Sequence, residues 1–240
     1  MKDYKLIFEE TFSKNGKPNP EIWSFEVGEK WSNNESQCYV EDLKNCYIEN
    51  GVLNLVATLQ DQTPCKYQST RINTYGKKHF LYGKFIIRAK MPQGKGSWPA
   101  IWFMGANKKN NVRWPLCGEI DLVEFAGNRM GKVSCAIHTE AYNHKINTDK
   151  GKSIDLLTAS SSFHDYILDW TKDYLSFSVD DQEIFRVTKE MNDTVEQWPF
   201  DQPFFMIINL AVGGWYGGSI VDADLPYRFQ IDSIKVYQNE

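Results

Sequence analysis

Short segments in which apolar and polar side chains alternate recur along most of this sequence, and segments with helical periodicity are scarce. In segment 85–91 every second side chain is apolar, and Arg88 and Lys90 fall between the apolar positions. Because successive side chains of a strand point to opposite faces, this period of two is typical of a half-buried β-strand. The same reasoning predicts strands and one hairpin turn at the following positions: 52–57, 175–179, 184–187 and 231–237, with the turn at 180–182.

Segment 204–212 is apolar on both faces, which indicates a strand buried inside a sandwich. One short helix is expected at 188–195. No linker rich in Pro, Ser or Gly divides the 240 residues, and many short strands separated by turn signals favour a sandwich or a barrel. The sequence therefore predicts one all-β domain that spans residues 1–240.

Charge and hydropathy exclude two classes of partner. The chain has 27 basic and 31 acidic residues and no basic cluster, so we expect no nucleic-acid partner. Its longest apolar run, 204–212, is far shorter than the ~20 residues that a membrane-spanning helix needs. Polar residues rather than an apolar leader follow Met1, so the protein is either cytoplasmic or exported with its leader absent from this sequence.

Five cysteines leave at least one thiol unpaired: Cys38, Cys46, Cys65, Cys117 and Cys135. No C-x-x-C motif occurs, which argues against a zinc ribbon or a thioredoxin-like site. We expect mostly free, buried thiols, since free cysteine behaves as a small apolar residue. A bridge between Cys38 and Cys46 is the main alternative.

One segment, 114–125, combines three carboxylates with apolar neighbours. On a regular strand Glu119 and Asp121 share a face, whereas Glu124 points the other way. A β-bulge inserts one extra residue and re-aims the side chains that follow it. A bulge at Leu122 and Val123 would therefore place all three carboxylates in one row, with the apolar residues on the reverse face.

Such a row suggests acid–base chemistry. Like charges this close cannot all ionise at their ordinary pKa values. A retaining glycoside hydrolase uses two carboxyl groups about 5–5.5 Å apart, one as nucleophile and one as general acid/base. From spacing alone two other interpretations stay open: a solvated acidic sheet face, and a calcium site built from carboxylate oxygens.

The motif Glu119-Ile-Asp121-Leu-Val-Glu124 resembles the signature of glycoside hydrolase family 16, the laminarinase-like β-glucanases, in its bulged form. Segments 31–37, 94–102, 209–214 and 232–237 are also similar to family segments, so the resemblance covers nearly the whole chain. It implies a concanavalin-like β-jelly-roll sandwich with an open concave substrate cleft. It also implies that Glu119 is the nucleophile, Glu124 the general acid/base and Asp121 the assisting carboxylate. No cofactor would be needed for catalysis.

An excess of aromatic residues supports a sugar-binding role. The chain has 8 Trp, 12 Tyr and 14 Phe, and flat rings can cover the apolar face of a sugar. The substrate-lining tryptophans are expected to be Trp98, Trp102, Trp114 and Trp215. The expected core tryptophans are Trp23, Trp170 and Trp198. Asn33, Glu35 and Arg71 are expected to bind sugar hydroxyls, with a surface salt bridge as the alternative role of Arg71.

His138 is placed by hairpin arithmetic. A simple hairpin centred near Arg129 puts His138 opposite Asp121, and the bulge makes this position uncertain by one residue. We expect His138 to face the acid row and to tune its charge or orient the substrate. The other histidines, His79, His144 and His164, are interpreted as structural.

The resemblance further implies a structural Ca²⁺ on the convex side, held by Glu9, the backbone carbonyl of Gly51 and Asp232. The expected activity is endo-hydrolysis of β-1,3-glucan or mixed-linkage β-1,3/1,4-glucan with retention. The alternatives are the same chemistry on a galactan (agar, carrageenan or porphyran) and a non-catalytic glucan-binding protein, in which one glutamate is typically lost. The expected partner is a β-glucan, and we expect a monomer. Because a polymer is too large to import, we expect a secreted, periplasmic or cell-surface location.

Overall fold

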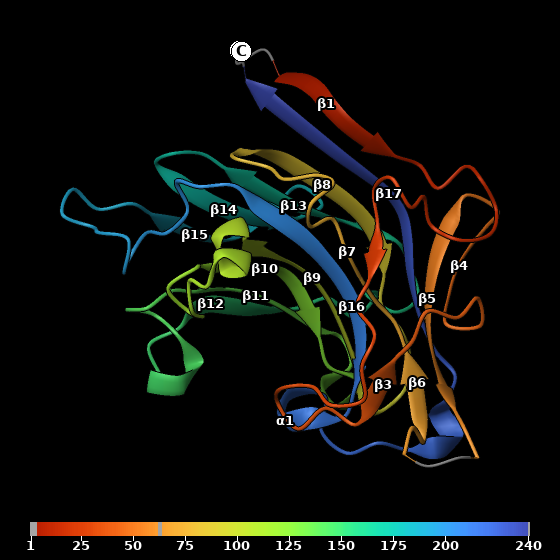
Figure 1. Ribbon diagram of the computed structural model, residues 1–240. Helices are drawn as coiled ribbons and strands as arrows, with labels where there is room; N and C mark the ends of the chain where they lie inside the picture. Colours follow the sequence, from red (N-terminus) through yellow and green to blue (C-terminus); the bar gives the residue numbers. More distant parts are fainter. Residues whose placement is uncertain (1–3, 62–63, 240) are drawn as a thin grey trace.

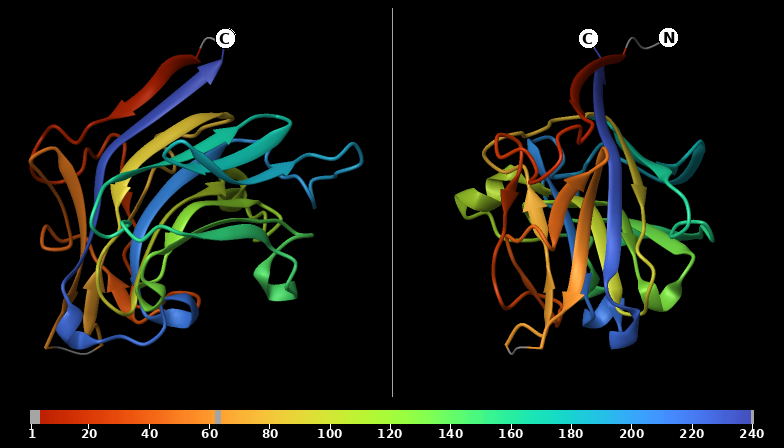
Figure 2. Two further views of the ribbon diagram at one scale, coloured as in Figure 1. Left: turned by 180° about the vertical axis from the view of Figure 1, so that it is seen from behind. Right: turned by 90° about the vertical axis from the view of Figure 1, so that its right-hand side faces the viewer.

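Two large sheets lie face to face, and the smaller one curves so that its outer face is concave (Figures 1 and 2). The computed structural model describes residues 4–61 and 64–239. This arrangement is the β-jelly-roll sandwich that the sequence predicts. The strands predicted from alternation lie within observed strands, except that Met91 of the predicted strand 85–91 follows the end of β8 at Lys90.

The ten-stranded sheet has the order β15 (Gln182–Thr188), β14 (Tyr174–Val179), β13 (His164–Trp170), β8 (Gly83–Lys90), β17 (Tyr227–Asn239), β5 (Val52–Leu59), β6 (Tyr67–Ser69) and β3 (Gln37–Tyr39), with β1 (Tyr4–Glu10) on β17 and β4 (Cys46–Glu49) on β5. The seven-stranded sheet has the order β12 (Lys150–Asp155), β11 (Lys132–His138), β10 (Glu119–Phe125), β9 (Ser97–Gly105), β16 (Phe204–Val212), β7 (Arg71–Asn73) and β2 (Ser24–Phe25). The short helices are η1 (Ala106–Asn110), η2 (Gly127–Arg129), η3 (His144–Ile146), α1 (Gly214–Gly217) and η4 (Asp222–Asp224).

The core lies between the two sheets, and β16 shows why one strand can be apolar on both faces. All nine of its residues are buried. Alternate side chains such as Phe204 and Met206 join the main core, whereas Phe205 and Ile207 pack in a second cluster with Met104. The strand is therefore covered on both sides, as its composition predicts.

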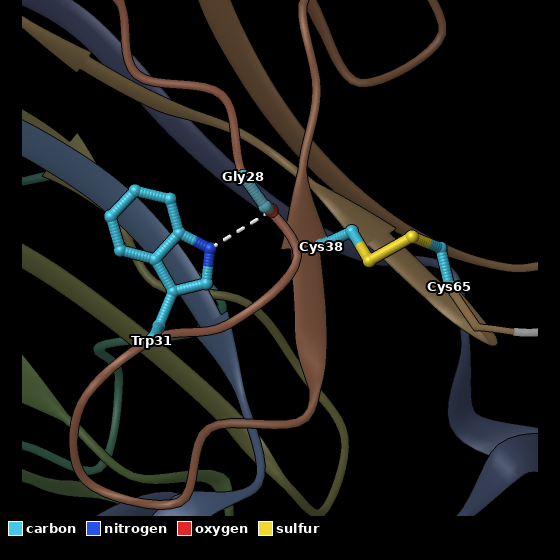
Figure 3. The surroundings of a disulfide bond; sticks show 4 residues. All are labelled: Gly28, Trp31, Cys38 and Cys65. Atoms are coloured by element: carbon cyan, nitrogen blue, oxygen red, sulfur yellow. Dashed lines mark hydrogen bonds between the residues drawn. A yellow bond between two sulfur atoms is a disulfide. The ribbon is translucent and has the colours of Figure 1, made fainter.

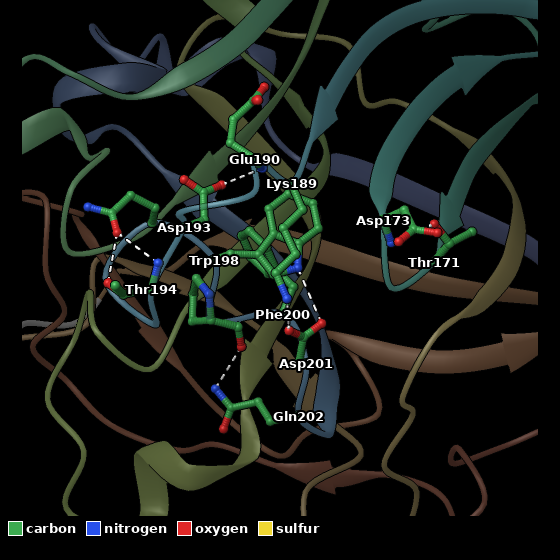
Figure 4. A network of polar contacts seen from close by, with 12 residues as sticks. Thr171, Asp173, Lys189, Glu190, Asp193, Thr194, Trp198, Phe200, Asp201 and Gln202 are labelled. Atoms are coloured by element: carbon green, nitrogen blue, oxygen red, sulfur yellow. Dashed lines mark hydrogen bonds and ion pairs between the residues drawn. The ribbon is translucent and has the colours of Figure 1, made fainter.

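The predicted helix at 188–195 is not formed. After β15 ends at Thr188, the chain makes turns that hydrogen bonds between its own polar side chains hold together (Figure 4). The backbone N–H of Glu190 donates to Asp193 (2.9 Å), and the Nζ of Lys189 lies 2.6 Å from Asp201. Polar side chains that bind nearby backbone groups stabilise turns and compete with helix formation.

A disulfide joins Cys38 to Cys65, with Cα atoms 5.4 Å apart, so the alternative of a Cys38–Cys46 bridge is wrong (Figure 3). The reason is topological: Cys38 lies in β3, which pairs with β6, and Cys65 lies just before β6. Cys46 is buried in β4, and Cys117 and Cys135 are also free and buried. The expectation of mostly free, buried thiols therefore holds for three of the five cysteines.

No helix in the described part of the chain is long and apolar enough to cross a membrane.

The three residues implied as calcium ligands come from β1, the β4–β5 turn and β17. In this structure the Glu9 carboxylate lies 3.7 Å from the Lys235 Nζ, and the Asp232 carboxylate lies 4.0 Å from the Arg88 Nε. Both carboxylates thus face cationic side chains, which does not support the calcium site, and it stays a prediction.

Candidate active site

The acidic strand β10 lies inside the concave sheet, between β9 and β11. Its register with both neighbours shifts after Asp121, which is the predicted bulge. Leu122 and Val123 are buried in the core (3% and 1% exposed), while Glu119, Asp121 and Glu124 line one cavity of about 280 Å³. The bulge therefore brings all three carboxylates to the concave face.

Each outer carboxylate of this row accepts a hydrogen bond from an indole. The Nε1 of Trp114 donates to Glu119 Oε2 at 3.0 Å, and the Nε1 of Trp98 donates to Glu124 Oε1 at 3.0 Å. A hydrogen bond from a rigid ring fixes the orientation of a carboxylate and favours its charged form. The two indoles thus hold the two ends of the row.

His138 faces the middle of the row, as expected, but its pairing differs from the prediction. Its backbone lies opposite Glu119, whereas Ala136 lies opposite Asp121. The turn after β10 shifts the register by one residue and the bulge shifts it by a second. The side chain nevertheless reaches Asp121: His138 Nε2 lies 3.3 Å from its Oδ2, and 4.0 Å from Glu119 Oε1.

Burial dominates the electrostatics of the row. It raises the pKa of Glu119 to about 8, with a further increase from the charge of Asp121 and a decrease from His138. Burial also raises the pKa of Asp121 to about 8. It raises the pKa of Glu124 to about 7, opposed by the Trp98 hydrogen bond. Because three anions cannot share this space, the row retains protons at neutral pH.

Four of the predicted substrate residues line the same cavity as the acids. Trp98, Trp215 and Asn33 contribute to its wall, together with His138. Trp98 is buried (6% exposed), whereas Trp215 is 56% exposed on α1. Trp114 packs beside the histidine, with ring centroids 6.1 Å apart.

The remaining predicted residues form a second group: Arg71 in β7 and Trp102 in β9 of the concave sheet, and Glu35 in the loop before β3. The Arg71 guanidinium lies over the Trp102 ring at 4.9 Å and also ion-pairs with Glu26 at 2.8 Å. Arg71 thus forms a salt bridge, which was the alternative to a role in binding sugar hydroxyls, and it contacts an aromatic ring as well. The Trp102 indole donates to Asn209 at 2.7 Å. Glu35 accepts hydrogen bonds from Gln37 and Tyr39, and burial raises its pKa. None of Glu35, Arg71 and Trp102 lines the 280 Å³ cavity.

Two residues near the acids were not assigned to the site from the sequence. His144 was interpreted as structural, but it lines the cavity and its ring packs against Trp114 at 5.2 Å. Tyr216, next to Trp215, also lines the cavity and packs against Trp98 at 5.3 Å. His144 lies in the polar stretch 142–152 that follows the His138 strand, and this stretch was the sequence signal that could have included it. The predicted core tryptophans are buried: Trp23, Trp170 and Trp198.

Among the described residues, one group of three potential metal ligands of the His, Cys, Asp or Glu type lies close together: Glu119, Asp121 and His138. This group is the acid row with its histidine. The buried thiols of Cys117 and Cys135 do not join it, and burial raises their pKa to about 11 and about 12. These two cysteines therefore remain protonated and inert near neutral pH.

Two carboxyl groups that flank a third on the concave face of a curved β-jelly-roll are the groups that a glycoside hydrolase uses on either side of the scissile bond. The chain belongs to glycosyl hydrolases family 16, whose sequence pattern matches residues 26–234. It is 38% identical to the β-glucanase of Rhodothermus marinus over 98% of this chain and 85% of that protein. It is 32% identical to the keratan-sulfate endo-1,4-β-galactosidase of Sphingobacterium multivorum, over 98% of this chain and 56% of that protein.

A solved structure agrees with this assignment. The laminarinase from Rhodothermus marinus superposes with a TM-score of 0.96 at 35% identity, covering 100% of this chain and 99% of the other. The predicted family, fold class and enzyme class are therefore confirmed.

Proposed function

We propose that this protein is a retaining endo-β-glucanase that cleaves internal bonds of β-1,3-glucan or mixed-linkage β-1,3/1,4-glucan. The observation that carries the proposal is the row on β10, in which Glu119 and Glu124 flank Asp121 and each accepts an indole hydrogen bond. The similarity to a β-glucanase and a laminarinase supports glucan as the substrate. A site on an open concave face suits cleavage within a polymer.

In this mechanism Glu119 attacks the anomeric carbon while Glu124 donates a proton to the departing glycosidic oxygen. Water then cleaves the glycosyl–enzyme ester, with Glu124 accepting its proton. The pKa of Glu124, raised to about 7 by burial, keeps much of this residue protonated at neutral pH. Glu119 acts in its ionised form, which His138 and the Trp114 hydrogen bond favour against the burial that raises its pKa to about 8.

Asp121 and His138 assist the two glutamates. Asp121 lies between them in the row, and its Oδ2 is 3.3 Å from His138 Nε2. A proton held between these two side chains reduces the repulsion that an ionised Glu119 meets. We assign the binding of sugar rings to Trp98, Trp102, Trp114 and Trp215. We assign the binding of hydroxyls to Asn33, Glu35 and Arg71, and to His138.

A galactan is the second candidate substrate, because the Sphingobacterium multivorum relative is a keratan-sulfate endo-β-galactosidase. A non-catalytic glucan-binding role has less support, since both glutamates are present. We further propose that catalysis needs no cofactor, that a calcium ion, where bound, is structural, and that the protein is a monomer. The Cys38–Cys65 disulfide supports a location outside the cytoplasm, where oxidised cysteines persist.

A substrate panel tests the proposal. Laminarin, barley β-glucan, lichenan, agarose and carrageenan are incubated with the protein, and the linkages of the released oligosaccharides are determined. We expect internal cleavage of the glucans, and NMR should show the retained anomer first. Cleavage confined to agarose or carrageenan would support the galactan alternative, and prompt release of the inverted anomer would refute double displacement.

A further inference from the structure

Four aromatic rings form a continuous line of contacts, and three of them, Trp98, His144 and Trp215, line the cavity that holds the acid row. The centroids of Trp98 and Trp215 are 5.7 Å apart, those of Trp215 and His144 are 5.7 Å apart, and those of His144 and Trp114 are 5.2 Å apart. We call these four residues the aromatic bridge. His144 comes from η3 and Trp215 from α1, two separate short helices that lie below the concave sheet (Figure 1).

The two ends of the aromatic bridge are the indoles that hold the catalytic glutamates. Trp98 donates to Glu124 and Trp114 donates to Glu119, each at 3.0 Å. The bridge therefore begins at one end of the acid row and finishes at the other. His138 lies against its middle, since the His138 and His144 rings are 5.0 Å apart. A polysaccharide that lies across the acid row must cross the line of these rings.

We propose that His144 is a specificity-determining residue, which limits the access of internal polymer segments to the acid row by closing the aromatic bridge against Trp215. The inference rests on the proposed function. A long chain has sugars on both sides of the scissile bond, so it can settle on the acids only when the His144–Trp215 contact opens. A short oligosaccharide has fewer sugars on either side of the scissile bond, so it depends less on that opening.

The contact between His144 and Trp215 is the part of the bridge that opens most readily. Trp98 and Trp114 are each held by a hydrogen bond to a carboxylate, whereas Trp215 is 56% exposed. A pair of aromatic rings shifts an equilibrium by about 2- to 10-fold. The free energy needed to open this contact is therefore small enough to permit catalysis. The effect of the contact on the equilibrium is still large enough to affect substrate choice.

The opening is a side-chain rotation and not a movement of the loop. The buried Asn143 side chain donates to the carbonyls of Thr139 (3.0 Å) and Glu140 (3.2 Å) and accepts from the Lys145 N–H (3.2 Å). These bonds fix the backbone on both sides of His144. Burial lowers the pKa of His144, so its ring is neutral at pH 7 and packs as an aromatic ring.

Substitution of His144 tests the proposal. For His144→Ala and for His144→Phe, kcat/KM is measured on a long soluble β-1,3-glucan and on a chromogenic β-1,3-linked trisaccharide. We expect the polymer-to-trisaccharide ratio of kcat/KM to rise about 2- to 10-fold in His144→Ala, because the ring that closes the bridge is gone. The ratio should stay within about 2-fold of wild type in His144→Phe, which keeps a ring.

Ile146→Ala is the matched control, because Ile146 lies in the same short helix and is 55% exposed away from the bridge contacts. Its ratio should equal that of wild type. If His144→Ala does not fold, His144→Gln takes its place, since it also lacks a ring. An unchanged or lower ratio in the folded ringless variant would overturn the role of His144. Wild-type protein that hydrolyses neither substrate would instead refute the proposed function.

Discussion

The indole N–H of Trp98 donates a 3.0 Å hydrogen bond to Oε1 of Glu124, although the two residues are 26 positions apart in the sequence. The bulge in β10 makes this contact possible, because it turns Glu124 toward the concave face where Trp98 lies. The bond favours the charged form of Glu124, and it therefore opposes the rise in pKa that burial causes. Its removal should change the pH dependence of the enzyme in a defined direction.

Trp98→Phe should move the basic limb of the kcat/KM profile to higher pH. The hydrogen bond opposes the effect of burial, so its loss raises the pKa of Glu124. The protonated form, which acts as the acid, then persists to higher pH. Hydrogen bonds to charged groups are worth about 1.5–3 kcal/mol, which corresponds to about 1–2 pKa units. Trp102→Phe is the control, because the Trp102 indole binds Asn209 instead. A basic limb at the wild-type pH in Trp98→Phe would contradict this account.

Glu119→Gln and Glu124→Gln should each reduce kcat by about 10²-fold or more while the protein remains folded, because each removes a group that acts in the transition state. Initial rates on laminarin and thermal unfolding measure the two effects. Glu41→Gln is a surface control. The Glu41 carboxylate lies 3.1 Å from the Lys17 Nζ, and both residues are far from the acid row in the sequence. Near-wild-type rates in either site variant would remove that residue from the mechanism.

The contribution of Asp121 to stability should fall as pH rises from about 4 to 8. Burial raises the folded pKa of Asp121 from 3.8 to about 8, so the folded state binds more protons than the unfolded state in this window. This contribution is complete below the unfolded pKa and is lost as pH rises through the folded pKa. Each pKa unit corresponds to about 1.4 kcal/mol.

Asp121→Asn should therefore raise the melting temperature at pH 8 relative to wild type and change it little at pH 4. Thermal unfolding across pH 4–9 gives the comparison. Asp181→Asn, in the exposed turn between β14 and β15, should leave the pH dependence as in wild type. Parallel curves for wild type and Asp121→Asn would show that this carboxyl group does not destabilise the fold at high pH.

Removal of the disulfide should lower the free energy of unfolding by about 3–4 kcal/mol, since a bridge across this many residues restricts the unfolded chain. Cys38 and Cys65 are 27 positions apart in the sequence. Cys38→Ala/Cys65→Ala should unfold at lower denaturant concentration, and reductant should destabilise wild type but not this double variant. Equal stability of oxidised and reduced wild type would mean that the bridge does not restrict the unfolded state.

Local pattern was enough to predict much of this protein. The alternation in segments such as 85–91 and the two apolar faces of 204–212 predicted strands that the structure contains, because side-chain direction in a strand depends on neighbouring residues alone. The same period placed the bulge at Leu122 and Val123, and with it the shared face of the three carboxylates. The family resemblance came from these and other ordered motifs in the chain.

Tertiary structure decided the contacts between distant segments. The pairing of β3 with β6 brought Cys38 to Cys65, and the turn and bulge together moved His138 opposite Glu119. The loop after β15 uses its polar side chains for local hydrogen bonds rather than for a helix. The packing of His144 between Trp114 and Trp215 depends on the meeting of two loops across a curved sheet. Such contacts join residues far apart in sequence, so they follow from the way the sheets pair and curve and not from any local pattern.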